Sequence, residues 1–130
     1  MLVAAWAVAV LHGAAVLFMV TGSLLALRRP RLLYLHTPVA LAILAVNLAG
    51  QPCPLTELEL ALRGAAGAAP YSGGFLGHYA LAPFGVGVHT VGAQVGIYLI
   101  AVVPNVVGYG LALRGVRVRR SRDGAVTPSR

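Results

Sequence analysis

The stretch LVAAWAVAVLHGAAVLFMVTGSLLAL, residues 2–27, contains no charged residue. At roughly 1.5 Å per residue, a helix of this length reaches about 39 Å, which is enough to cross a ~30 Å hydrocarbon core. Residues 32–50 and 88–113 form two further apolar stretches, although Pro38 and Pro104 interrupt them. The sequence therefore predicts an all-α membrane protein with three transmembrane helices, at 2–27, 32–50 and 88–113.

The composition separates this chain from soluble domains. It is 58% hydrophobic and 10% charged, whereas soluble domains carry about a quarter of their residues as charges. The net charge of +7 comes mostly from arginines that follow apolar stretches, at residues 28–31 and 114–130. That distribution is typical of the ends of membrane spans and not of a nucleic-acid-binding face. We therefore expect the lipid bilayer, not nucleic acid, as the partner.

The two basic segments also set the predicted topology. With three spans they lie on the same side of the membrane, which the positive-inside rule assigns to the cytoplasm. The N-terminus then lies outside, and because no basic segment precedes residues 2–27, we expect that span to be retained. We predict one membrane domain over residues 1–115 and a disordered, basic cytoplasmic tail over residues 116–130.

The charge-free stretch over residues 75–113 leaves a four-span alternative open, because it is too long for one straight helix. A fourth span would place the arginine-rich tail outside. The Gly73–Gly74 pair, Pro83 and Gly85 interrupt its first part. These residues favour an interfacial or re-entrant segment on the outer side.

A polar island, QPCPLTELELALRGAAGAAPYSGGFLGHY at residues 51–79, separates the second and third spans. It begins an expected outer cap over residues 51–87. Thr56 and Glu59 have the spacing of a capping box, and Glu59 and Arg63 are four residues apart. We therefore expect a short helix from Thr56 to Arg63, with Thr56, Glu59 and Arg63 in structural roles.

Polar and small residues recur within the three spans at helical spacing, which predicts an antiparallel three-helix core. They are His12, Ala15, Met19 and Gly22; His36, Ala40, Ile43 and Asn47; and Gln94, Tyr98, Ala101, Asn105 and Gly108. By depth, the outer ones converge with the island, while His36 lies near the cytoplasmic end and too far away. The candidate functional cluster is His12, Asn47, Gln51, Cys53, Glu57, His78, Tyr79 and His89.

Four interpretations of this cluster stay open. Cys53, His78, His89 and a glutamate are suitable ligands for a divalent metal, but they lack a recognised spacing. His12 and His89 could hold haem b, and His78 and Tyr79 could line a quinone or lipid-headgroup pocket. Alternatively, the histidines only stabilise helix packing, which is the account we favour. Hydrolysis by a Ser/His/Asp triad lacks support, since the only aspartate is Asp123 in the tail.

Two motifs carry a family resemblance. They are CPLTELE at Cys53–Glu59, followed by Arg63, and YSGGFLGHY at Tyr71–Tyr79. With the histidines of LHGAAVLF and LLYLHTPVA, they resemble the small bacterial membrane proteins of domain-of-unknown-function family 2784, over roughly residues 8–113. Pro83-Phe84-Gly85 departs from the Tyr-Pro pair of relatives, and this departure leaves the path of residues 80–88 open.

The resemblance implies an architecture without an assigned activity, substrate or cofactor. We therefore expect a multi-pass protein of the bacterial inner membrane that serves as a non-enzymatic accessory or binding component. Other membrane subunits or further copies of the chain are its candidate partners. The alternative is a membrane redox protein that binds haem, metal or quinone through the His/Cys/Glu cluster.

Overall fold

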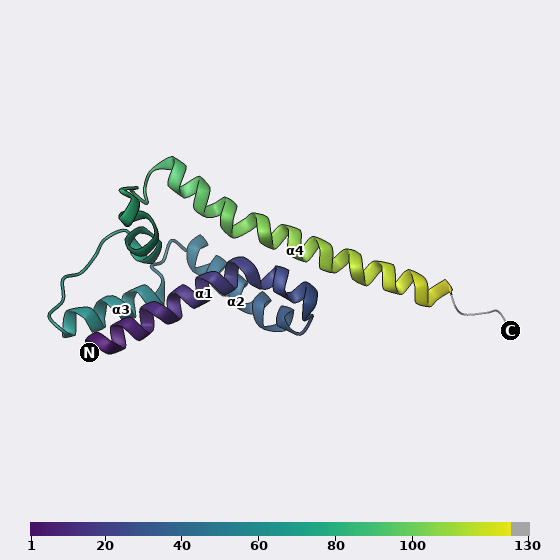
Figure 1. The fold of residues 1–130 in the computed structure, drawn as a ribbon, viewed down its shortest axis with the longest axis horizontal. Helices are drawn as coiled ribbons and strands as arrows, with labels where there is room; N and C mark the ends of the chain where they lie inside the picture. The colour runs from purple at the N-terminus through teal and green to yellow at the C-terminus, as the bar shows by residue number, and fades with distance from the viewer. Residues whose placement is uncertain (126–130) are drawn as a thin grey trace.

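A computed structural model describes the backbone of residues 1–125 and the side chains of residues 1–115, and this part of the chain contains helices and no strand. The α-helices are α1 (Leu2–Arg28), α2 (Leu32–Leu48), α3 (Pro54–Ala65) and α4 (Val91–Ala125). A π-helical turn, η1 (Leu76–Leu81), and a 3-10 turn, η2 (Ala82–Phe84), precede α4 (Figure 1). The predicted all-α class is confirmed.

Two of these helices are long and apolar enough to cross a membrane, by length and composition: α1 and the part of α4 from Val91 to Gly115. The second predicted span is shorter than expected, because α2 ends at Leu48 and has 17 residues. The chain leaves the helix at Gly50, whose φ of +63° is a conformation that glycine adopts without steric cost. The structure thus contains two clear candidate spans and one shorter apolar helix.

Helix α1 is the centre of the fold, because α2, α3 and α4 all pack against it. In Figure 1, α3 lies beside its N-terminal half and α4 approaches its C-terminal half. The first part of α4 stands away from α1 in the same view. Each half of α1 therefore has its own packing partner.

The chain from α2 to α3 follows α1 in the opposite direction (Figure 1). His36 of α2 contacts the carbonyl of Met19, Cys53 at the start of α3 contacts His12, and further along Tyr79 lies beside Trp6. The island was expected as a cap beyond the spans. Instead, α3 lies beside α1, with a break at residues 49–53 between it and α2.

The predicted capping box is wrong. Helix α3 begins at Pro54, with Cys53 as its N-cap residue and no side-chain cap hydrogen bond. Proline fits the first helical position because its amide nitrogen needs no partner there. The helix therefore starts two residues before Thr56, and both Thr56 and Glu59 are buried within it. The sequence correctly predicted a short helix here. The observed helix begins earlier, at Pro54, and ends later, at Ala65, than the predicted one.

The segment between α3 and α4 contains short helical turns. η1 and η2 together cover Leu76 to Phe84, too few residues to cross a membrane as a helix. Glycines at positive φ flank these turns, with Gly73 at +82°, Gly74 at +68° and Gly85 at +69°. A continuous fourth helical span is therefore not formed here, while the interfacial or re-entrant location stays a prediction.

Helix α4 continues past the predicted end of the third span to Ala125. Residues 116–125 are thus helical, although disorder was expected for them. The run from Val116 to Arg122 contains no glycine or proline to end the helix. The rest of the predicted disordered tail, residues 126–130, lies outside the described residues.

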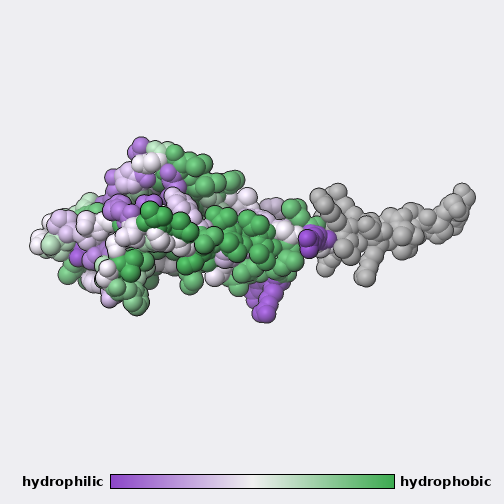
Figure 2. Space-filling view, turned by 90° about the horizontal axis from the view of Figure 1, so that it is seen from above, coloured by the Kyte–Doolittle hydropathy of each residue, from purple (hydrophilic) through white to green (hydrophobic). Residues whose placement is uncertain are grey.

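Polar and apolar side chains are distributed in the opposite way to those of a water-soluble protein. The buried apolar residues among those described are Ala5, Ala9 and Ala26, whereas His12, Ser23, His36, Thr56 and Glu59 are buried polar residues. Large apolar side chains lie on the surface instead, for example Val3, Val10 and Val91 at 83%, 71% and 78% exposed. Figure 2 shows the hydrophobic residues spread over the surface of the helices.

Candidate functional site

The first buried polar site, here named the outer centre, is built around Glu59 of α3. Its carboxylate is fully buried. Tyr71 donates a hydrogen bond of 2.9 Å to Oε2, and Tyr79 donates one of 2.6 Å to Oε1. Each carboxylate oxygen therefore accepts a bond from one phenol. The two phenols link the loop after α3 and the turn η1 to the helix.

This arrangement also changes the acidity of the two phenols. Burial raises the pKa of Tyr71, and the hydrogen bond to Glu59 raises it further. The pKa of Tyr79 is raised by the same two causes in the same order. A phenolate beside the carboxylate would place two negative charges in contact. Both tyrosines therefore stay protonated donors over the neutral range.

Aromatic rings and an arginine complete the outer centre. The ring of His78 stacks on Tyr71, with centroids 4.0 Å apart and an angle of 7°. Arg63 lies over the ring of Tyr71, with its guanidinium carbon 5.5 Å from the ring centroid. The sequence suggested a Glu59–Arg63 pair. In the structure, tyrosines bind the carboxylate, and Arg63 interacts with an aromatic ring.

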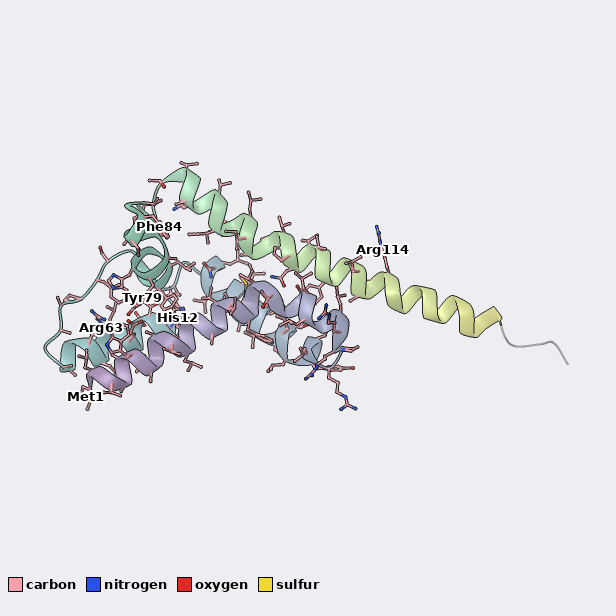
Figure 3. All side chains as sticks on the ribbon, in the orientation of Figure 1. Met1, His12, Arg63, Tyr79, Phe84 and Arg114 are labelled. Carbon is pink, nitrogen blue, oxygen red and sulfur yellow. The ribbon has the colours of Figure 1, made fainter. Side chains whose placement is uncertain are left out.

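His12 connects α1 to the start of α3. It is 6% exposed, and its Nε2 lies 3.5 Å from Sγ of Cys53. Phe75 stacks on the imidazole at 4.1 Å between centroids, and the same ring lies close to Gly13. Nδ1 of His12 is buried without a hydrogen-bond partner. The imidazole is thus held between a thiol and an aromatic ring. Figure 3 places His12 in the same region as Tyr79.

The structure brings together half of the predicted cluster. His12 contacts Cys53, and His78 packs on Tyr79 within the outer centre. The others lie apart. Asn47 and Gln51 are exposed and bond to nearby carbonyls, Glu57 is exposed on the first turn of α3, and His89 is exposed. His89 lines a shallow hollow with Ser72, Gly73, Gly77, Ala82, Val86, Gly87 and Val88.

Several of the donor groups considered for a cofactor are already engaged within the chain. Within the described residues, no three His, Cys, Asp or Glu side chains are placed to hold one metal ion. For haem b, Nε2 of His12 faces Cys53 and Nδ1 is buried, so neither nitrogen is directed at open space. For a quinone, the hydroxyl of Tyr79 is already bonded to Glu59. The geometry thus supports neither a metal ion nor haem b at these residues, and one of the two groups considered for a quinone is already used.

Sequence reasoning missed the residues at the middle of the outer centre. Glu59 was assigned to a helix cap, and Tyr71 and Phe75 were left out of the cluster. One signal was present. Glu59 is one of three acidic residues in the chain, and Thr56, Glu59 and Arg63 have the spacing of a single helix face. On a helix in an apolar chain, such a face indicates an internal polar contact.

The second buried polar site, here named the inner centre, is built around His36 of α2. His36 is fully buried. Its Nε2 lies 3.1 Å from the carbonyl of Met19, and its Nδ1 lies 2.8 Å from the hydroxyl of Tyr109. Because a carbonyl only accepts, Nε2 donates, and Nδ1 of the neutral ring accepts from Tyr109. Thr37 lies 3.1 Å from the same hydroxyl.

Close helix packing surrounds the inner centre. Asn105 of α4 donates to the carbonyls of Met19 and Ala101, at 2.9 and 2.7 Å. Ser23 of α1 donates to the carbonyl of Pro104 at 3.2 Å, which joins α1 to the proline-containing part of α4. The three predicted stripes therefore meet in the halves that lie nearer the basic turn at residues 28–31. Gln94 and Tyr98, near the start of α4, are exposed.

The comparisons with known proteins agree with the motif resemblance. A family model described as "Protein of Unknown function (DUF2784)" matches residues 2–110. The matched range includes both polar centres and all helices up to the middle of α4. Neither the curated proteins nor the solved structures gave a match to the chain.

Proposed function

The chain belongs to the DUF2784 family, and we propose that it is an integral membrane protein that serves as a non-enzymatic accessory or binding component. The proposed location is the bacterial inner membrane. The family itself carries no assigned activity, so the proposal rests on how this chain distributes its polar and apolar groups. We take the outer centre as the part that a partner or ligand would sense.

The observation that carries the proposal is the reversed polarity. Large apolar side chains of α1, α2 and α4 are exposed, while the buried positions hold alanines and hydrogen-bonded polar residues. Water would oppose this arrangement, because exposed apolar area costs about 25 cal/mol per Å². In lipid it is favourable, since polar groups need partners inside the protein and small residues allow close helix approach.

The helix lengths support three membrane crossings in this proposal. α2 alone would reach roughly 26 Å at about 1.5 Å per residue, slightly less than a ~30 Å hydrocarbon core. α3 continues the path of α2 beside the N-terminal half of α1. We therefore propose that α2, the break at residues 49–53 and α3 form one discontinuous crossing between α1 and α4. The outer centre then lies at the outer end of this crossing, where Tyr79 packs beside Trp6 near the start of α1.

The arginines support the proposed orientation. Arg28, Arg29 and Arg31 lie at the turn between α1 and α2, at the far end of α1 from Met1. Figure 3 places Arg114 on the part of α4 that points in the same direction. Under the positive-inside rule this end faces the cytoplasm, so the N-terminus lies outside.

The saturation of the outer centre supports a non-enzymatic role. Both oxygens of Glu59 accept bonds from phenols of the same chain, and Tyr71 is covered by His78 and Arg63. A general acid or base needs one of these sites free for a reacting proton. The network instead ties α3, the following loop and η1 together as one polar unit.

Alkaline carbonate extraction of membranes tests the membrane assignment. The expected result is that the chain stays in the pellet and is released only by detergent. A peripheral protein followed in the same samples is the control, because carbonate must release it. Recovery of folded chain in the carbonate supernatant would contradict the proposal.

Impermeant thiol labelling in intact cells tests the orientation. A Cys53→Ser background provides a cysteine-free chain, since Cys53 is the only cysteine. Ser72→Cys, at an exposed position near the outer centre, should label in intact cells. Ser121→Cys should label only after the membrane is opened. The opposite pattern would reverse the orientation without affecting the carbonate result.

A further inference from the structure

A group of uncompensated positive charges lies at the turn between α1 and α2. Arg28, Arg29 and Arg31 are all exposed there. The chain contains no acidic residue before Glu57, which belongs to α3 beside the other half of α1. Three positive charges within four residues therefore face the surroundings without a nearby carboxylate from the described part of the chain.

A shallow hollow on α1 leads to these charges. It is lined by Thr21, Leu24, Leu25 and Arg28. The opposite side of the same turns of α1 is packed: Gly22 faces His36, Ser23 bonds to Pro104, and Ala26 is buried. The hollow is therefore on the free side of the helix, with two leucines along it and an arginine at its end.

We propose that this hollow and the basic turn bind an anionic phospholipid. One acyl chain lies along Leu24 and Leu25, and the phosphate is held by Arg28 together with Arg29 and Arg31. The inference rests on the proposed membrane location, because it needs the hollow to face lipid. It goes beyond the proposed function because it names a class of lipid and the residues that would bind it.

The charges favour an anionic headgroup over a zwitterionic one. Guanidinium groups bind phosphate oxygens in paired hydrogen bonds. The helix dipoles do not offset this, since the negative end of α1 lies beside the positive end of α2 at the same turn. The quaternary ammonium of a phosphatidylcholine would be placed near three arginines and repelled. Phosphatidylglycerol carries the phosphate without that opposing charge.

The hollow distinguishes a lipid from a free phosphate ion. A phosphate ion would contact only the arginines, whereas the apolar wall formed by Leu24 and Leu25 adds contact area for an acyl chain. Leu24 and Leu25 are 38% and 49% exposed, so an acyl chain can reach them. The amphipathic pairing of this wall with Arg28 matches the amphipathic structure of a phospholipid.

Native mass spectrometry of the delipidated full chain in detergent tests the inference. Phosphatidylglycerol and phosphatidylcholine with the same acyl chains are titrated separately. We expect tighter binding of phosphatidylglycerol, and a reduction of about tenfold or more in the double variant Arg28→Gln/Arg29→Gln, since each arginine contributes about 1 kcal/mol at an anionic lipid. Leu25→Ala should weaken the binding of both lipids.

Arg114→Gln is the matched control, because Arg114 is exposed and basic but does not line the hollow. Its binding of phosphatidylglycerol should stay close to that of the unchanged chain. Equal affinity for the two lipids, or an equal loss in Arg114→Gln, would overturn the inference. Inorganic phosphate that displaces the lipid at millimolar concentration would also overturn it, because the acyl chain would then contribute nothing.

Circular dichroism of each variant shows whether its helices are retained. If the double variant fails to fold, Arg31→Gln removes a single charge from the same turn and should also weaken binding of phosphatidylglycerol. The carbonate experiment separates this inference from the proposed function. A chain that stays in the carbonate pellet and yet shows no preference for phosphatidylglycerol refutes the lipid site alone. A chain released by carbonate refutes the membrane assignment itself.

Discussion

The outer and inner centres are both buried and polar, but they hold the fold in different ways. The outer centre is a carboxylate, Glu59, bound by Tyr71 and Tyr79 from a loop and a short turn. The inner centre is an imidazole, His36, bound to a phenol and to a backbone carbonyl between three long helices. One contains a charged acceptor that binds side chains from a loop and a short turn. The other consists of neutral groups between closely packed backbones.

This difference predicts what each centre tolerates. Hydrogen bonds to a charged group contribute about 1.5–3 kcal/mol each, so the outer centre depends mainly on its side chains. Neutral bonds between membrane helices contribute about 0.6 kcal/mol each. The inner centre therefore depends more on the close approach of α2 and α4 to α1 than on any single bond. Removing a group should damage the outer centre more, and adding a group should damage the inner centre more.

Glu59→Ala should have the largest effect, lowering the free energy of unfolding by about 3 kcal/mol. It removes the acceptor of two phenols and leaves Tyr71 and Tyr79 without their common partner. Titration with a denaturing detergent, followed by circular dichroism, measures the loss. Glu57→Ala is the control, since Glu57 is exposed two residues earlier on the same helix. Equal losses in the two variants would mean that the outer centre does not stabilise the fold.

Gly108→Ala should lower the free energy of unfolding by about 2 kcal/mol, as overpacking of a tight contact does. A Cβ at Gly108 would lie 2.6 Å from Oγ of Ser23 and 2.8 Å from its backbone carbon, so a side-chain rotation cannot relieve the clash. Gly110→Ala is the matched control, because no atom lies within 4 Å of its added Cβ. The control should be neutral or stabilising, since alanine favours a helix. If the two variants behave alike, α1 and α4 do not pack as described.

The sequence predicts the helices of this chain well, because charge-free stretches and basic flanks depend on local composition. It also places His12, Cys53, His78 and Tyr79 among the residues that meet. The path of α3 could not be predicted in the same way. Whether a short amphipathic helix lies beyond a span or beside it depends on how that helix packs against α1, and such packing is a tertiary effect.

His36 shows a second limit of prediction from the sequence, which concerns helical periodicity. Its spacing with Asn47 predicted a shared stripe in the three-helix core, and its depth placed it near the cytoplasmic end, away from the outer cluster. The structure shows that the stripe is divided: His36 is buried against Met19 and Tyr109, while Asn47 is exposed. Periodicity identifies a face of a helix and gives no information on where a neighbouring helix diverges. That divergence is visible only in the arrangement of α4 relative to α1 (Figure 1).

His36→Phe should have a smaller effect, of about 1 kcal/mol, because it keeps an aromatic ring and loses two neutral bonds. The bond lost to Tyr109 leaves that hydroxyl able to bond to Thr37. Thermal unfolding in detergent measures the change, with His89→Phe as the control at an exposed histidine. A loss as large as that of Glu59→Ala would remove the proposed distinction between charged and neutral centres.

Alkaline pH should produce the smallest effect and should act on the outer centre alone. Burial and the bond to Glu59 raise the pKa of Tyr71 and Tyr79 in the folded state. Their stabilising contribution is therefore complete below the ordinary tyrosine value of about 10 and is lost as pH rises toward the raised folded values. At pH of about 10 the unfolded phenols are half ionised, so each tyrosine costs roughly 0.4 kcal/mol of stability. Unfolding curves at pH 8 and 10 measure this loss, and the double variant Tyr71→Phe/Tyr79→Phe should be less sensitive to the change. If the variant loses as much stability over this range as the unchanged chain, other groups cause the pH dependence and the phenols of the outer centre are not shifted.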